Sequence, residues 1–194
     1  MFRRKKSGSG ARLPGFMKGF SRPDVQAEPM RPSGSLSELV DAASDKQKCE
    51  SERCAALSAL TERVCMSESD ISALEPRLGA LLEEASDSVA SAASTALAAN
   101  FLGQGDFQSL LSLASHPRFA VRKGAISEAE VFVVACGYDA RMGPVFAAGL
   151  LEDDPDIRRA CRVAFSEGAG KNDEWAAKFL AVATEREKKG RLDS

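Results

Sequence analysis

The chain has 194 residues, of which 44% are apolar, 28% are charged and 6% are aromatic. This composition is typical of a soluble globular protein. No apolar run approaches the roughly 20 residues that cross a bilayer, and no apolar segment follows the basic start at Met1–Lys6, so the sequence predicts neither a membrane span nor a secretory signal. Alanine and leucine dominate the apolar residues, which favours close-packed helices over a sheet.

Charge is distributed unevenly along the chain. Residues 1–34 hold eight basic and two acidic residues, a net charge of +6, whereas the remainder holds 18 basic and 26 acidic residues, a net charge of −8. A basic arm on an acidic body is a pattern typical of an interaction segment.

Residues 1–34 are also dense in glycine and proline, which cannot sustain a helix or a central strand. We therefore expect a disordered basic arm. The segment Leu13–Phe20 within it carries Phe16 and Phe20 with no core to bury them. Such a segment often folds onto a partner, and Phe16 and Phe20 are therefore candidate partner-binding residues. The alternatives are that it packs back on the body or stays loose.

Residues 35–68 are predicted to form one long N-terminal helix. Ser35 and Glu38 have the spacing of a capping box, in which each side chain satisfies a backbone amide of the first turn. Apolar residues then follow at spacings of three and four. The polar stretch 45–48 is where this helix, running from about 36 to 66, would break if it is not continuous.

Residues 69–189 are predicted to be a series of helical pairs, followed by a tail at 190–194. The expected helices are 76–85, 88–102, 107–115, 118–136, one opening at Pro144, 156–166 and 174–189. Val131–Cys136 could be a buried strand, but no second strand exists to pair with it. The last helix is expected to cap the domain with Trp175, Phe179 and Val182 facing inward.

A short phrase recurs in these pairs. Aligning Val89, Val121 and Ile157 gives periods of 32 and 36 residues, which is typical of a stacked helical repeat. In each copy a small residue follows where helices of adjacent pairs would approach closely. These residues are Ala92, Gly124 and Ala160.

The phrase resembles the second helix of the HEAT-repeat family, among the armadillo-like α-solenoids. Asp154–Cys161 matches the family pattern of an Asp/Pro turn, Val/Ile-Arg and small residues, and His116–Ala125 matches it with one extra turn residue. Asp87–Ala93 departs from it because Ala90 replaces the arginine. The resemblance covers roughly residues 76–170 and implies a HEAT-like superhelix that presents a binding surface.

The basic residues of the repeats have two interpretations. In such solenoids the arginine after Val/Ile often pairs with an acidic residue at the neighbouring turn, which is the structural interpretation of Arg122 and Arg158. In the other interpretation a basic ridge contacts a partner or nucleic-acid phosphates, as in the similar HEAT-like DNA glycosylases. The ridge would contain Arg118, Arg122, Lys123, Arg158, Arg159 and Arg162. The acidic body and the lack of an aromatic-rich patch with a suitable carboxylate argue against base excision.

Catalytic and metal-binding patterns are incomplete. The five cysteines have irregular spacings and no nearby histidine, which favours thiols in a reducing, cytoplasmic compartment over a zinc site. The only histidine, His116, precedes a proline in a turn. Gly168–Lys171 lacks the flanking residues of a phosphate loop, and Asp153–Asp156 lacks the acidic twelfth residue of a calcium loop. We expect no catalytic residue, metal or cofactor.

The sequence therefore predicts a non-enzymatic scaffold or adaptor that presents a helical-repeat surface to a protein partner. The alternative is a nucleic-acid-binding accessory factor whose arm residues Arg3, Arg4, Lys5 and Lys6 contact phosphates, together with the ridge. The same arm could contact an anionic membrane surface. The partner's identity and the oligomeric state stay open.

Overall fold

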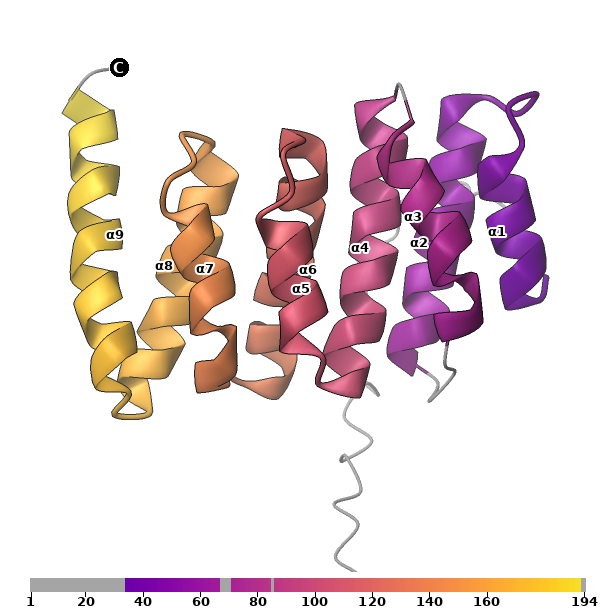
Figure 1. The fold of residues 1–194 in the computed structure, drawn as a ribbon. Coiled ribbons are helices and arrows are strands. Elements are labelled where there is room, and N and C mark those ends of the chain that lie inside the picture. Colours follow the sequence, from indigo (N-terminus) through magenta and orange to yellow (C-terminus); the bar gives the residue numbers. More distant parts are fainter. Residues whose placement is uncertain (1–33, 67–70, 85, 193–194) are drawn as a thin grey trace, which may run out of the picture. The chain divides into compact units, whose positions relative to one another are not determined.

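The computed structural model describes residues 34–66, 71–84 and 86–192, except for the side chains of residues 66 and 186–192. All regular elements in this part of the chain are helical, so the predicted all-α class is confirmed. The predicted disordered arm and the last two residues of the predicted tail lie outside the described residues, apart from Gly34. The helices are α1 (Leu36–Ser44), α2 (Glu50–Met66), α3 (Glu75–Leu82), α4 (Asp87–Gln104), α5 (Phe107–Ala114), α6 (Phe119–Cys136), α7 (Gly143–Gly149), α8 (Pro155–Gly170) and α9 (Glu174–Leu192), with short 3-10 helices η1 (Ser72–Leu74) and η2 (Ala140–Met142) (Figure 1).

The prediction of one continuous N-terminal helix was wrong, and the alternative of a break near 45–48 is confirmed. The capping box at Ser35 and Glu38 is present, but the helix that it starts ends at Ser44, and α2 begins at Glu50. The polar stretch bends here because it can satisfy its own backbone: the Asp45 carboxylate accepts the Gln47 amide at 2.9 Å. The two helices pack against each other as a hairpin, which buries the apolar side of each.

The predicted ends of the last two helices also need correction. Helix α8 continues to Gly170 and α9 continues to Leu192, so residues 190–192 are helical and not part of a tail. Gly168 does not end α8. It is buried inside the helix, where an added Cβ would lie 2.7 Å from the Tyr138 ring, so a glycine is needed there for packing.

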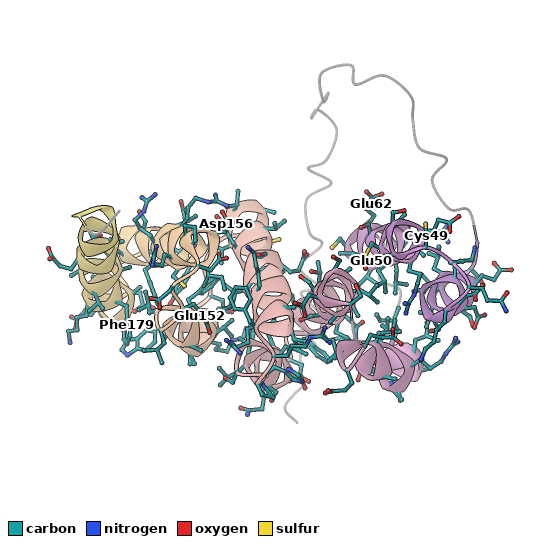
Figure 2. All side chains as sticks on the ribbon, turned by 90° about the horizontal axis from the view of Figure 1, so that it is seen from above. Cys49, Glu50, Glu62, Glu152, Asp156 and Phe179 are labelled. Carbon is teal, nitrogen blue, oxygen red and sulfur yellow. The ribbon has the colours of Figure 1, made fainter. Side chains whose placement is uncertain are left out.

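The described helices, from α1 to α9, lie in two rows (Figures 1 and 2). Helices α2, α4, α6, α8 and α9 form the second row, in which each helix packs on the next along the chain. Helices α1, α3, α5 and α7 form the first row, and each is the hairpin partner of the second-row helix that follows it (Figures 1 and 2). Four hairpins are thus followed by α9, which has no first-row partner among the described residues.

The aligned residues of the recurrent phrase occupy matching places. Val89, Val121 and Ile157 are each the third residue of their helix, in α4, α6 and α8, and each is at most 1% exposed. Gly124 marks a close helix approach, because an added Cβ would lie 2.4 Å from the backbone oxygen of Ser91 in α4. The alternation of hairpins therefore buries equivalent positions in successive layers.

Candidate interaction surface

The turns before α4, α6 and α8 and the first residues of these helices carry most of the predicted basic residues. We call residues 82–84, 86–87, 115–123 and 151–158 together the turn edge. Arg118 precedes α6 directly and reaches back to the turn before α4. Its guanidinium donates to Asp87 at 2.7 and 2.9 Å, to the Leu82 carbonyl at 2.9 Å and to the Glu84 carbonyl. This side chain therefore joins two successive hairpins.

Arg122 and Lys123 make the same kind of connection forward along the chain. The Arg122 guanidinium donates to the two Glu152 oxygens at 2.6 and 3.2 Å and to the carbonyls of its own turn. Lys123 Nζ lies 3.0 Å from Asp154 and 3.2 Å from Asp156. Hydrogen bonds to Asp154, and then to Asp156, raise the pKa of Lys123, so the ammonium is charged at neutral pH. The pairing of Arg122 with the neighbouring turn is the one that the structural interpretation predicts.

The remaining predicted ridge residues lie on α8. Arg158 Nη1 is 4.0 Å from Asp153 in its own turn, and Arg159 pairs with Glu130 of α6 at 3.2 Å. Arg162 is half-buried on the same helix. The structure thus brings Arg118, Arg122, Lys123 and Arg158 to one edge and leaves Arg159 on a separate α6–α8 contact. The acidic partners offset much of the ridge's positive charge.

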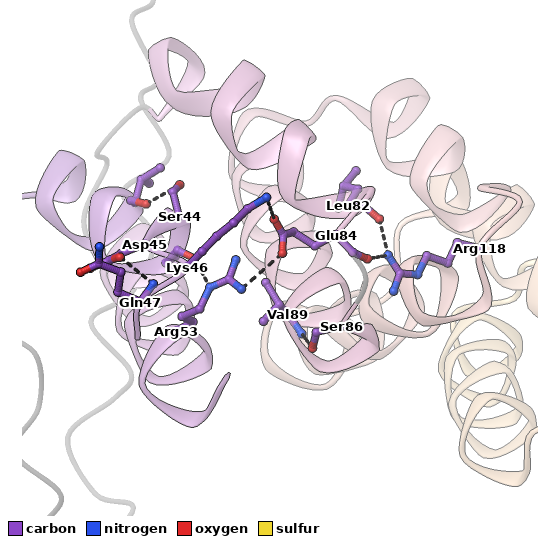
Figure 3. A network of polar contacts seen from close by, with 12 residues as sticks. Ser44, Asp45, Lys46, Gln47, Arg53, Leu82, Glu84, Ser86, Val89 and Arg118 are labelled. Carbon is purple, nitrogen blue, oxygen red and sulfur yellow. Dashed lines mark hydrogen bonds and ion pairs between the residues drawn. The ribbon is translucent and has the colours of Figure 1, made fainter. Parts of the chain in front are cut away.

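Sequence reasoning missed a buried arginine that connects the first hairpin to the second. Arg53 of α2 is only 7% exposed; its Nε donates to the Ala43 carbonyl at 2.6 Å and its Nη1 lies 3.3 Å from Glu84 (Figure 3). Lys46 approaches the same carboxylate at 3.5 Å. No periodicity marks Arg53, because its partner lies 31 residues away.

A second kind of surface is apolar and lies at the C-terminal end. Trp175 and Phe179 of α9 pack against Phe165 of α8, with ring centroids 6.1 and 5.4 Å away, and Phe165 meets Phe146 of α7 at 6.2 Å. Trp175 is nevertheless 40% exposed and Val182 is 50% exposed. The prediction that Val182 faces inward was wrong, and Trp175 is only partly covered. Among the described residues, no first-row helix beyond α7 packs against this side of α9.

Other large apolar side chains are exposed in the described part. They are Phe119, Val131, Val134 and Leu151. Val131 and Val134 lie one turn apart near the end of α6. They are outside the apolar set that the helical spacing places inward, which is Val121, Ala125, Ala129, Phe132, Val133 and Cys136. Cys136 is exposed, since the inward-facing set ends at Val133.

His116 and the cysteines are the residues whose side chains could serve in catalysis or metal binding. The described residues contain no cluster of three or more His, Cys, Asp or Glu that could hold a metal ion. His116 Nδ1 accepts the Arg118 amide at 3.1 Å, which orders the turn. The five cysteines form no disulfide, and Cys161 is buried with its thiol 3.2 Å from the Phe146 carbonyl.

The predicted arm residues Phe16, Phe20, Arg3, Arg4, Lys5 and Lys6 lie outside the described residues. Among the described helices, none combines the length and apolar character needed to cross a membrane.

Comparison with known proteins found no matching family model, no matching curated protein and no matching solved structure.

Proposed function

We propose that this chain is a non-enzymatic interaction protein whose HEAT-like helical repeat presents a surface to a protein partner. The observation that carries the proposal is the matching burial of Val89, Val121 and Ile157 at the third position of α4, α6 and α8. Units that bury the same position layer after layer make an extended surface, and repeat proteins use such surfaces for binding.

The turn edge supports the repeat and contributes little free charge for binding. Arg118 pairs backward with Asp87, and Arg122 and Lys123 pair forward with Glu152 and Asp154. Because these charges already have partners, binding energy has to come mainly from apolar side chains exposed elsewhere. Tryptophan is among the side chains that contribute most to the energetics of protein interfaces, and Trp175 is 40% exposed.

The nucleic-acid alternative rests on the +6 charge of residues 1–34. The ridge adds little to it, since Arg118, Arg122, Arg158 and Arg159 are ion-paired. A binding constant for a DNA duplex that falls steeply with salt, and that deletion of residues 1–34 abolishes, would favour this alternative.

The proposal is tested by photo-cross-linking on the intact chain. A benzophenone amino acid replaces an exposed residue on the first row (Ser112), on the second row (Val131) or at the C-terminal end (Val182), one position at a time. We expect the same protein species to be cross-linked from neighbouring positions and to be displaced by excess unmodified chain. Cross-linking from no position, or cross-links that excess chain does not displace, would contradict the proposal.

A further inference from the structure

Helix α6 carries exposed apolar side chains at the centre of the second row. Val131 is 57% exposed and Val134 is 69% exposed, whereas Val133 between them is 1% exposed. Ala135, next along the helix, is exposed as well. Among the described helices the second row runs α2, α4, α6, α8 and α9, so α6 has helices of the same row on both sides. We call Val131, Val134 and Ala135 the α6 patch.

The α6 patch faces out of the row, away from both neighbouring helices. Gly124 marks the side of α6 that meets α4, since an added Cβ there would lie 2.4 Å from the α4 backbone. Glu130 marks the opposite side, because it pairs with Arg159 of α8 at 3.2 Å. At roughly 3.6 residues per turn, Val131 and Val134 lie between these two sides around the helix. No described helix covers them, as their exposure shows.

The flank of the α6 patch toward α2 is acidic. The Cys65 thiol of α2 donates to Glu128 of α6 at 3.7 Å, so these two helices meet on the outer side of α4. Glu62 lies one turn before Cys65 on the same side of α2, and its side chain extends away from the first row (Figure 2). We call Glu62 and Glu128 the acidic flank.

Neither carboxylate of the acidic flank has a cation beside it. The ion pairs formed within the described part of the chain include neither Glu62 nor Glu128. Burial raises the pKa of Glu128, and the hydrogen bond from Cys65 offsets only part of that effect. A positive group placed here would therefore meet two carboxylates that lack a partner.

The flank of the α6 patch toward α8 is basic. The Arg159 side chain is 58% exposed, and its guanidinium contacts the Glu130 oxygens at 3.2 and 3.4 Å. Because a guanidinium has more N–H donors than one carboxylate takes, Arg159 can pair with a second carboxylate. Glu128 and Glu130 are two residues apart, so the acidic and the basic flank lie at the same height along α6.

This pattern is complementary to itself under one particular rotation. A two-fold axis parallel to α6 brings the α6 patch against its own copy and exchanges the two flanks at unchanged height. The basic flank of each copy then faces the acidic flank of the other. A two-fold axis across α6 would instead set basic flank on basic flank, which like-charge repulsion disfavours. Two-fold dimers with such a self-complementary surface are the commonest oligomers.

The position of the α6 patch also suits a dimer of this kind. The patch alone is too small, since a stable interface buries about 1,200 Å² or more in total. Rotation about an axis along α6 places α8 of each copy opposite α4 of the other. The contact therefore extends over helices on both sides of the patch.

We propose that two copies of this chain associate through the outer side of the second row, with their α6 patches in contact across a two-fold axis parallel to α6. Arg159 of each copy faces Glu62 and Glu128 of the other. This inference goes beyond the proposed function, which concerns a different protein and leaves the oligomeric state open.

Sedimentation equilibrium of the intact chain, at concentrations up to about 100 µM, tests for a dimer with a micromolar dissociation constant. Val131→Asp should weaken association at least about tenfold, because it buries a carboxylate without a partner at the centre of the contact.

Val182→Asp is the matched control, because Val182 is 50% exposed on the side of α9 that carries Phe179, which points toward the first row (Figure 2). It should change the dissociation constant less than about twofold. Equal unfolding midpoints of the two variants verify that both fold.

Charge exchange between the copies tests the arrangement. Glu62→Arg and Arg159→Glu should each weaken self-association, because each puts like charges across the axis. An equimolar mixture of these two variants should associate more tightly than either alone, since both contacts of the mixed dimer again join opposite charges. The comparison does not depend on whether either variant loses stability, because the same two proteins are measured separately and together.

A monomer at every concentration would overturn the inference, as would Val131→Asp that associates like Val182→Asp. A mixture no tighter than its components would overturn it too, and photo-cross-links from Val131 to a different protein alone would assign the patch to that protein. Cross-links from Ser112 and Val182 do not involve the α6 patch, so failure of the inference and failure of the proposed function are distinguishable.

Discussion

The approach of α6 to α4 depends on one missing side chain, that of Gly124. A methyl group there would meet the Ser91 carbonyl, which is fixed by the α4 backbone. We expect Gly124→Ala to destabilise the fold by about 1–3 kcal/mol, the usual cost of overpacking a core. Gly79→Ala is the control, since nothing lies within 4 Å of an added Cβ in α3, and it should stabilise by up to about 1 kcal/mol. Urea midpoints of both variants give the comparison, and equal shifts would contradict it.

The buried thiol of Cys161 predicts a loss of stability in alkali. Burial raises its pKa to about 12 from the model-compound value of 9.0, with Glu130 and Glu152 adding to the effect. Because the unfolded thiol ionises first, its stabilising contribution is complete below about pH 9 and is lost as pH rises toward 12. Within that window we expect unfolding free energy to fall about 1.4 kcal/mol per pH unit more steeply in the unchanged chain than in Cys161→Ala. Parallel curves of unfolding free energy against pH for the two proteins would contradict this. Cys49→Ala serves as the control, because Cys49 is exposed.

At the scale of the elements, caps explain where the helices of the hairpins begin. Asp154 accepts the amides of Asp156 and Ile157 at 2.9 and 3.1 Å and also holds Lys123 of the preceding hairpin. The residue thus starts α8 and ties it to α6. Both roles belong to one carboxylate at a helix N-terminus, where a negative charge is also favourable.

Replacing this cap should cost more than replacing its neighbour. We expect Asp154→Ala to destabilise by about 1–2 kcal/mol, because a cap and an ion pair are lost together. Asp156→Ala, which removes only a pair with an exposed carboxylate, should cost less than about 1 kcal/mol. Asp154→Ser should recover the capping part. Thermal unfolding measures all three, and equal losses for Asp154→Ala and Asp156→Ala would refute the capping argument.

At the scale of the whole array of helices, stability against local opening should be highest at α4. This helix packs on α2, α3, α5 and α6, and nearly every residue from Val89 to Leu102 is buried. Helices α1 and α9 are each covered on fewer sides. In stacked repeats, local opening proceeds more easily from the ends.

Amide hydrogen exchange should therefore be slowest in the centre of α4 and faster in α1 and α9. Mass spectrometry of peptides along the native chain measures the gradient. Protection highest in α9 would contradict the packing argument.

The candidate site was predictable only where its signals are local. The Ser35 capping box follows from residues within one turn. The matching valine and isoleucine positions follow from a short motif that recurs at periods of 32 and 36 residues. The sequence located the possible break between α1 and α2 at a polar stretch but did not decide whether the break occurs. That depends on whether two shorter helices gain stability by packing side by side. Val182 has the spacing of a buried residue but is 50% exposed, because burial depends on which helices pack against α9.

What the sequence alone determined is the all-α class, most helix limits and the three matching buried positions, since caps and periodicity act over a few residues. The tertiary structure decided which charges meet. Arg53 pairs with Glu84 and Arg118 pairs with Asp87, each at a separation of 31 residues. Such pairs form only after the hairpins stack, because stacking brings together turns that a local pattern cannot relate.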